Sequence, residues 1–160
     1  MAIKQNPLPA SNTGRLFEAG VNYQYFEGEI DSLNNFAFLG FKSTGVIHHL
    51  GLPAERAPDH FGLILQGFID IPVTGVYRFK TISDDGSRLM IDEEIVVNND
   101  GLHGAETVEG EIALEKGYHR IKVWYFESTG GELLEVKITG PGISERVIPG
   151  EMLFREKMGE

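Results

Sequence analysis

Apolar and polar residues alternate with a period of two through much of the stretch 61–139, and turn residues interrupt the alternation at short intervals. Leu63, Leu65 and Ile69 fall on one side of the first such segment, whereas Gln66 falls on the other. Successive side chains of a β-strand point to opposite faces of a sheet. The pattern therefore predicts a chain built from strands, each with one face turned to a core.

The spacing of alternating segments and turn residues predicts seven or eight short strands. Expected strands are 21–26, 61–71, 76–82, 88–92, 107–114, 118–126 and 133–139, and the short segments 45–47 and 94–97 are further candidates for an eighth. Hairpin turns are expected at Lys116-Gly117 and at 128–131. Such spacing is typical of an all-β antiparallel sandwich or barrel. The residues expected in its core are Leu65, Ile69, Tyr77, Phe79, Leu89, Ile91, Val123 and Val136.

The length of 160 residues is that of one domain. Residues 1–19 mix Pro, Asn, Ser and Gly and are interpreted as a leader or linker. Residues 20–150 form the expected β domain, and residues 151–160 a C-terminal tail or short helix.

Composition excludes several classes of function. The net charge of −10 argues against nucleic acid and anionic membrane surfaces as partners. The absence of cysteine excludes disulfides, thiolate zinc sites and a cysteine nucleophile. No stretch is apolar enough for membrane insertion, and the first residues lack the core of a signal peptide. The chain is then cytosolic, or has lost a signal peptide, or is a module of a longer protein.

Asp84 and Asp85 are adjacent acids between two strand-like segments. Neighbouring side chains converge only where the backbone turns, and two converging carboxylates suit a hard cation such as calcium. Asp85-Gly86 is also a common hairpin sequence, and turns without metal are far commoner than metal sites built on them.

Other polar residues are weaker candidates. Asn99 and Asp100 either line a ligand site or simply form a turn, and His103 in the same loop is expected to hydrogen-bond within it. Trp124 is expected in the core rather than as a sugar platform. No catalytic motif is present, and no pair of carboxylates is placed across a recognisable cleft.

Several motifs resemble the PA14 domain family in the expected order. The run 83–89, Ser-Asp-Asp-Gly-Ser-Arg-Leu, is similar to that family's signature, and Gly67-Phe68-Ile69 with the segment 72–79 resembles the approach to it. The segments 23–28, 100–104, 114–119 and 123–127 also match. The resemblance covers roughly residues 20–150.

The resemblance implies a site as well as a fold. In sugar-binding members of the family, a cis peptide joins the paired aspartates, which hold a calcium ion that contacts glycan hydroxyls. Asp84 and Asp85 match those positions. Further ligands come from a later loop, which corresponds here to 127–132 and contains no Asn or Asp. Either Glu127 or Glu132 substitutes for the missing ligand, or the calcium site is vacant. The expected carbohydrate-binding residues are Asn99, Asp100, His103, Glu127 and Glu132.

These features predict a non-catalytic carbohydrate-binding module, accessory to a secreted glycan-processing protein. The resemblance implies a secreted, cell-surface or periplasmic location, a glycan ligand and an adjacent catalytic domain. Two alternatives stay open: a structural or protein-interaction domain that packs against such a catalytic domain, and a small glycosidase.

Overall fold

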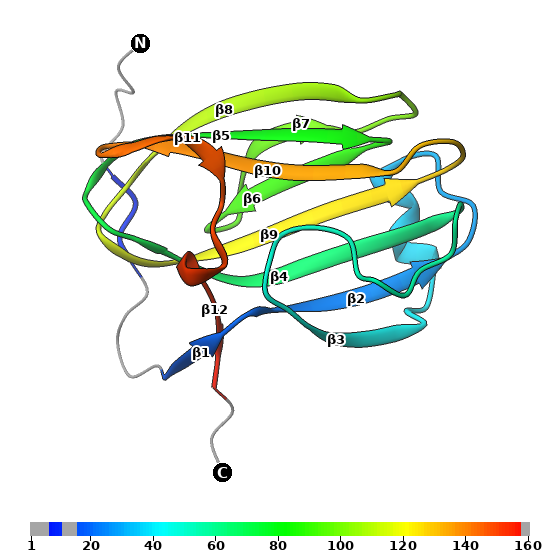
Figure 1. Ribbon diagram of the computed structural model, residues 1–160, viewed down its shortest axis with the longest axis horizontal. Coiled ribbons are helices and arrows are strands. Elements are labelled where there is room, and N and C mark those ends of the chain that lie inside the picture. The colour runs from blue at the N-terminus through cyan, green and yellow to red at the C-terminus, as the bar shows by residue number, and fades with distance from the viewer. Residues whose placement is uncertain (1–6, 11–15, 158–160) are drawn as a thin grey trace.

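The computed structural model describes residues 7–10 and 16–157, which form two antiparallel sheets packed face to face (Figure 1). This confirms the all-β sandwich. The larger sheet contains β1 (Phe17–Ala19), β2 (Val21–Glu27), β3 (Ser43–Ile47), β4 (Phe61–Ile71), β6 (Ser87–Ile91), β7 (Glu94–Asn99), β9 (Gly117–Glu127) and β12 (Leu153–Glu156). The smaller contains β5 (Gly75–Asp84), β8 (Glu106–Leu114), β10 (Leu133–Gly140) and β11 (Ile143–Val147). Two 3-10 helices are η1 (Leu33–Phe38) and η2 (Gly150–Met152).

β4 is the centre of the larger sheet. One of its edges pairs with β9 along its whole length, and the other is shared between β2 and β12. In the smaller sheet, β5 lies between β8 and β10. The described residues contain no helix long and apolar enough to cross a membrane.

The expected hairpins at 116–117 and 128–131, and the hairpin alternative at Asp85-Gly86, are wrong. β5 pairs with β8 and β10, whereas β6, which follows it, pairs with β7 and β9 in the other sheet. The connections from β8 to β9 and from β9 to β10 likewise pass between sheets. Turn residues permit the chain to reverse, but they do not specify whether it returns beside its own strand.

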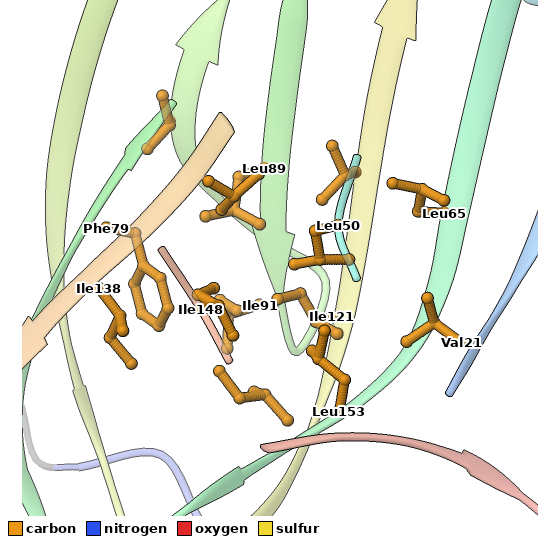
Figure 2. Packing of buried hydrophobic residues seen from close by; sticks show 14 of the residues in the cluster. Val21, Leu50, Leu65, Phe79, Leu89, Ile91, Ile121, Ile138, Ile148 and Leu153 are labelled. Atoms are coloured by element: carbon orange, nitrogen blue, oxygen red, sulfur yellow. The ribbon is translucent and has the colours of Figure 1, made fainter. Parts of the chain in front are cut away.

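The core fills the space between the sheets (Figure 2). All eight residues expected there are fully buried, which confirms the alternation as a guide to the inner face. Burying one such side chain stabilises the fold by about 1.5–3 kcal/mol. A second apolar cluster lies on the other face of the larger sheet, under the segment that contains η1, and consists of Phe26, Ile30, Leu33, Phe36, Ile64 and Phe126.

Both ends of the chain differ from the expectation. Residues 17–19 form β1 instead of a linker, and Leu8 bridges to Leu114 beside β8. Of the tail or short helix expected over 151–160, the described residues form the end of the 3-10 turn η2 and the strand β12, and residues 158–160 lie outside the described residues. Leu153 is fully buried and pairs with Ile69, so the C-terminal strand closes the sheet. The rest of the expected leader, residues 1–6 and 11–15, lies outside the described residues.

Candidate functional site

Two connections between the sheets meet at one end of the sandwich. The first joins β5 to β6 through Asp84, Asp85 and Gly86, and the second leaves β9 after Glu127. The backbone N–H of Asp85 donates to the carbonyl of Phe126 (3.1 Å), and the N–H of Phe126 donates to that of Gly86 (3.0 Å). The expected cis peptide joins Asp84 and Asp85.

Gly86 makes the close approach of these connections possible. A Cβ atom at this position would stand 2.5 Å from the ring of Phe126 and 2.9 Å from the backbone nitrogen of Gly101. Both distances are shorter than any contact that packed atoms tolerate. The Asp-Asp-Gly sequence thus suits a tight crossing between sheets, with the two acids directed at β9.

Three carboxyl groups converge at the crossing. One oxygen from each of Asp84, Asp85 and Glu127 lies within 4.8 Å of the others, the one such group of potential metal ligands among the described residues. Asp85 and Glu127 are buried, whereas Asp84 is partly exposed. The cluster therefore has a buried base and one member that reaches solvent.

The three carboxyl groups differ in their partners. Asp85 accepts hydrogen bonds from the backbone N–H of Ser128 on one oxygen (2.9 Å) and of His103 on the other (3.2 Å). Both oxygens of Glu127 are buried, and no described residue donates a hydrogen bond to either. An unpartnered buried carboxylate is costly, so Glu127 must be protonated or neutralised by a cation.

The pKa values of the cluster lead to the same conclusion about Glu127. Burial, followed by the neighbouring Asp85 and Asp84, raises the pKa of Glu127 to about 9. Burial and the charge of Asp85 also raise the pKa of Asp84, although His103 acts in the opposite direction. Without a cation, Glu127 is therefore neutral at pH 7, and a bound cation would favour its ionised form.

Asn99 lies behind the carboxyl cluster. Its side-chain amide is buried and donates to Ser83 Oγ (3.3 Å), Thr81 Oγ1 (3.4 Å) and the carbonyl of Glu106 (3.0 Å). The amide thus ties the end of β7 to β5 and β8. It supports the aspartate connection from behind and is not a member of the group of three.

Asp100 and His103 organise the loop after β7. Asp100 accepts hydrogen bonds from the Ser32 hydroxyl (3.0 Å) and from the backbone N–H of Leu33 (2.9 Å), so it fixes the start of η1. The ring nitrogens of His103 lie 2.8 Å from the carbonyl of Asn99 and 2.7 Å from that of Gly104. The loop hydrogen bonding expected of His103 is confirmed.

Glu132 lies apart from the carboxyl cluster, because Arg56 holds it in an ion pair at 2.5 Å. Of the two glutamates considered as substitute ligands, the fold brings only Glu127 to the aspartates. Nothing in the sequence indicates the role of the Ser128 N–H or of Tyr125, whose hydroxyl donates to the carbonyl of Asp84 (2.5 Å). Main-chain donors and a core tyrosine have no sequence signal of this kind.

The carboxyl cluster suits a calcium ion. Calcium prefers oxygen ligands, and carboxylates are the strongest of these in proteins. Asp84, Asp85 and Glu127 would hold the ion, and the unsatisfied oxygens of Glu127 are the feature of this structure that such an ion would explain. When bound, calcium supplies open coordination positions for further oxygen ligands.

Fold and site together define an antiparallel β-sandwich with a cluster of carboxyl groups on the connections at one end. The sequence profile of the PA14 domain matches residues 50–151. The chain belongs to the PA14 domain family, as its motifs predicted.

Several solved structures share the fold. An anti-sigma factor domain-containing protein from Clostridium clariflavum has a TM-score of 0.76 and 22% identity, covering 89% of this chain and 49% of its own. A PA14 sugar-binding domain from an RTX adhesin has a TM-score of 0.72 and 17% identity, and the match covers 86% of this chain and 98% of that domain. The third structure is the subtype-switched Epithelial Adhesin 9 to 1 A domain from Candida glabrata, solved with beta-lactose. Its TM-score is 0.75 and its identity 14%, and the match covers 96% of both chains.

At these identities the likeness establishes the fold alone. The chain spans about half (49%) of the Clostridium clariflavum protein. No curated protein matches the chain in sequence.

Proposed function

We propose that this chain is a non-catalytic carbohydrate-binding module that uses calcium held by Asp84, Asp85 and Glu127. The observation that carries the proposal is the convergence of three carboxyl groups with Glu127 buried and unpartnered. Similar folds from an RTX adhesin and from Candida glabrata are described as sugar-binding or were solved with a sugar. These similarities support the choice of ligand class.

The protein's own residues have separate roles in this proposal. Asp85 is positioned by the N–H groups of Ser128 and His103, so its oxygens are fixed before any ligand arrives. Asp84, the partly exposed member, lies where a ligand from solvent would enter. Glycan hydroxyls would complete the coordination at the open positions.

We also propose an extracellular location and a role as an accessory to a glycan-processing protein, in keeping with the adhesin neighbours. The competing function is a structural domain that packs against a catalytic neighbour. That function requires neither calcium nor a sugar, so metal and sugar binding distinguish the two.

The test is a calorimetric titration of the chain with calcium, followed by β-lactose and a panel of other sugars. We expect saturable calcium binding and a higher unfolding midpoint in calcium, because an ion that binds only the folded state stabilises it. Asp84→Ala and Asp85→Ala should each abolish both effects, since each removes one of few side-chain anions.

The matched control is Asp70→Ala. Asp70 is a partly buried aspartate near the opposite end of β4 from Phe61, which pairs with Glu127. Its removal should leave calcium binding intact. An unchanged midpoint in millimolar calcium, or sugar binding that survives Asp85→Ala, would favour the structural-domain function.

A further inference from the structure

A row of paired residues crosses the outer face of the larger sheet, away from the core. Asn22 on β2 pairs with Gln66 on β4, Gln66 pairs with Lys122 on β9, and Lys122 pairs with Met90 on β6. Residues directly opposite one another on neighbouring strands share a face. Four strands thus present two amides, one ammonium group and one thioether in a line.

This row forms part of the lining of a groove. The residues Asn22, Gln66, Lys122 and Met90 all border one cavity of about 580 Å³. A second cavity, of about 460 Å³, adjoins it and shares Asn22 and Gln66. Gln66 is also the one exposed residue of β4, whose other ten positions are buried or half-buried.

The two ends of this face are covered by different elements. Toward the carboxyl cluster, Phe36 of η1 packs edge-to-face on Trp124 at 5.4 Å between ring centroids. Toward the other end, Phe154 of β12 pairs with Phe68, and Phe68 pairs with Arg120. The groove lies between these covers and runs across the strands.

Two cations of the groove, Lys122 and Arg120, are held in place by aromatic rings. Lys122 Nζ lies 4.4 Å from the centroid of the Trp124 ring, and the guanidinium carbon of Arg120 lies 5.4 Å from that of Phe68. Neither side chain forms an ion pair within the described part of the chain. Cation–π contacts thus fix both positive charges and leave their hydrogen-bond donors for a ligand.

The charge of the groove contrasts with that of the whole chain. In the lining, Arg120 and Lys122 balance Glu93 and Glu156, so the groove is far less acidic than the chain as a whole, which carries −10. Arg155 is paired with Glu18. The two cations that have no carboxylate partner among the described residues, Arg120 and Lys122, favour an anionic ligand, because charge complementarity makes an interface more specific and its association faster.

We propose that this groove is a second binding site, independent of metal, for a glycan that carries uronate carboxylates. The amides of Asn22 and Gln66 would hydrogen-bond hydroxyl groups, and Lys122 and Arg120 would bind the carboxylates. The choice of a glycan rests on the proposed carbohydrate-binding function, whereas the charge argument does not.

The test uses the whole chain in a chelator, so that the carboxyl cluster cannot bind calcium. Trp124 is the only tryptophan, and its fluorescence therefore reports on the groove. We expect saturable changes on titration with an oligogalacturonate, which weaken as salt is raised. The methyl-esterified form of the same oligosaccharide, which lacks the charge, should bind far more weakly.

Lys122→Gln and Arg120→Gln should each weaken binding about tenfold, the effect of losing one charge-assisted hydrogen bond. Lys137→Gln is the matched control, because it removes the same charge from β10 in the smaller sheet. Unfolding midpoints of the variants separate loss of binding from loss of fold.

Several outcomes would overturn the inference. These are absence of binding in chelator, equal binding of the methyl ester, and unchanged affinity in Lys122→Gln. Equal binding of a poly-glutamate peptide would make the groove a site for acidic protein segments and refute the glycan assignment. Because the titration excludes calcium, failure here leaves the calcium proposal standing, and failure of calcium binding leaves the groove standing.

Discussion

At the scale of single residues, the protonation state of Glu127 links the fold to the candidate site. Its carboxyl group is fully buried, has no described hydrogen-bond donor and lies beside two aspartates. The pKa of about 9 that results makes it neutral at pH 7 in the absence of a cation. Glutamine has nearly the same shape as the neutral acid but cannot become an anion.

We therefore expect Glu127→Gln to leave stability in chelator within about 0.5 kcal/mol of the natural protein. The rise of the unfolding midpoint in calcium should disappear, because one of three anionic ligands is gone. Thermal unfolding with and without calcium measures both effects. The control is Glu132→Gln, which should keep the calcium effect because Arg56 holds that side chain outside the cluster. A calcium-induced shift that persists in Glu127→Gln would contradict the assignment.

His119 is a second buried titratable group, and it is not part of the carboxyl cluster. The imidazole is fully buried, with Nδ1 2.5 Å from Asp92 Oδ2 and Nε2 2.7 Å from the carbonyl of Glu115. Both neighbours are acceptors, so both ring nitrogens must donate and the ring is an imidazolium. Burial opposes the charge, but the hydrogen bonds to Asp92 and Glu115 outweigh it and raise the pKa of His119.

The pKa of His119 is higher in the folded protein than in the unfolded chain, where it is near 6.5. Protonation of His119 therefore stabilises the folded state, and this contribution is complete below about pH 6.5. That contribution is lost as pH rises through the folded pKa. We expect the free energy of unfolding to fall over this window, and Asp92→Asn to reduce stability by about 2 kcal/mol at pH 6 and by less at high pH. Chemical denaturation across pH measures this. A decrease that is the same at every pH would rule out the imidazolium.

At the scale of elements, the strands β7 and β8 approach closely at one side of the sandwich. They belong to different sheets, and Gly110 of β8 lies against Val96 of β7. A Cβ atom on Gly110 would stand 2.0 Å from the carbonyl oxygen of Val96. The sheets can close at this side only because residue 110 has no side chain.

Gly110→Ala should therefore force the strands apart and destabilise the fold by about 2–3 kcal/mol, the typical cost of overpacking. Denaturant unfolding measures the loss. Gly104→Ala is the control, since nothing lies within 4 Å of its added Cβ, and it should be nearly neutral. Equal stability of the two variants would show that β7 and β8 have room between them.

At the scale of the whole molecule, three carboxyl groups meet at one end of the sandwich, on the connections between its sheets. Retaining and inverting glycosidases need two carboxyl groups on either side of the scissile bond, about 5 Å or more apart. Asp84, Asp85 and Glu127 instead lie within 4.8 Å of one another, as ligands of one ion would.

We therefore expect no release of monosaccharide or shortened product from lactose or oligogalacturonate, with or without calcium. Chromatography of long incubations at high protein concentration is the measurement. Turnover that persists through repurification and is lost in Asp85→Ala would make the chain a glycosidase. Turnover unaffected by that variant would indicate a contaminating enzyme.

The sequence by itself determined the long strands between residues 61 and 139 and the residues that fill the core, but not β1, β11 or β12. Alternation is a local property, and it decides which side of a strand is apolar, so Tyr77, Phe79, Leu89 and Val123 could be placed in advance. The adjacent acids Asp84 and Asp85 also indicated a candidate metal site, although the same residues equally suit a turn without metal.

Only the tertiary structure decided how the strands are distributed between sheets. Turn residues look alike whether a chain returns beside its own strand or crosses to the facing sheet, so the crossing after Asp84 could not be distinguished from a hairpin. That crossing brings Glu127 to the aspartates, while Arg56 draws Glu132 away. The row from Asn22 to Lys122 likewise depends on pairing between strands distant in sequence, because long-range register has no local signal.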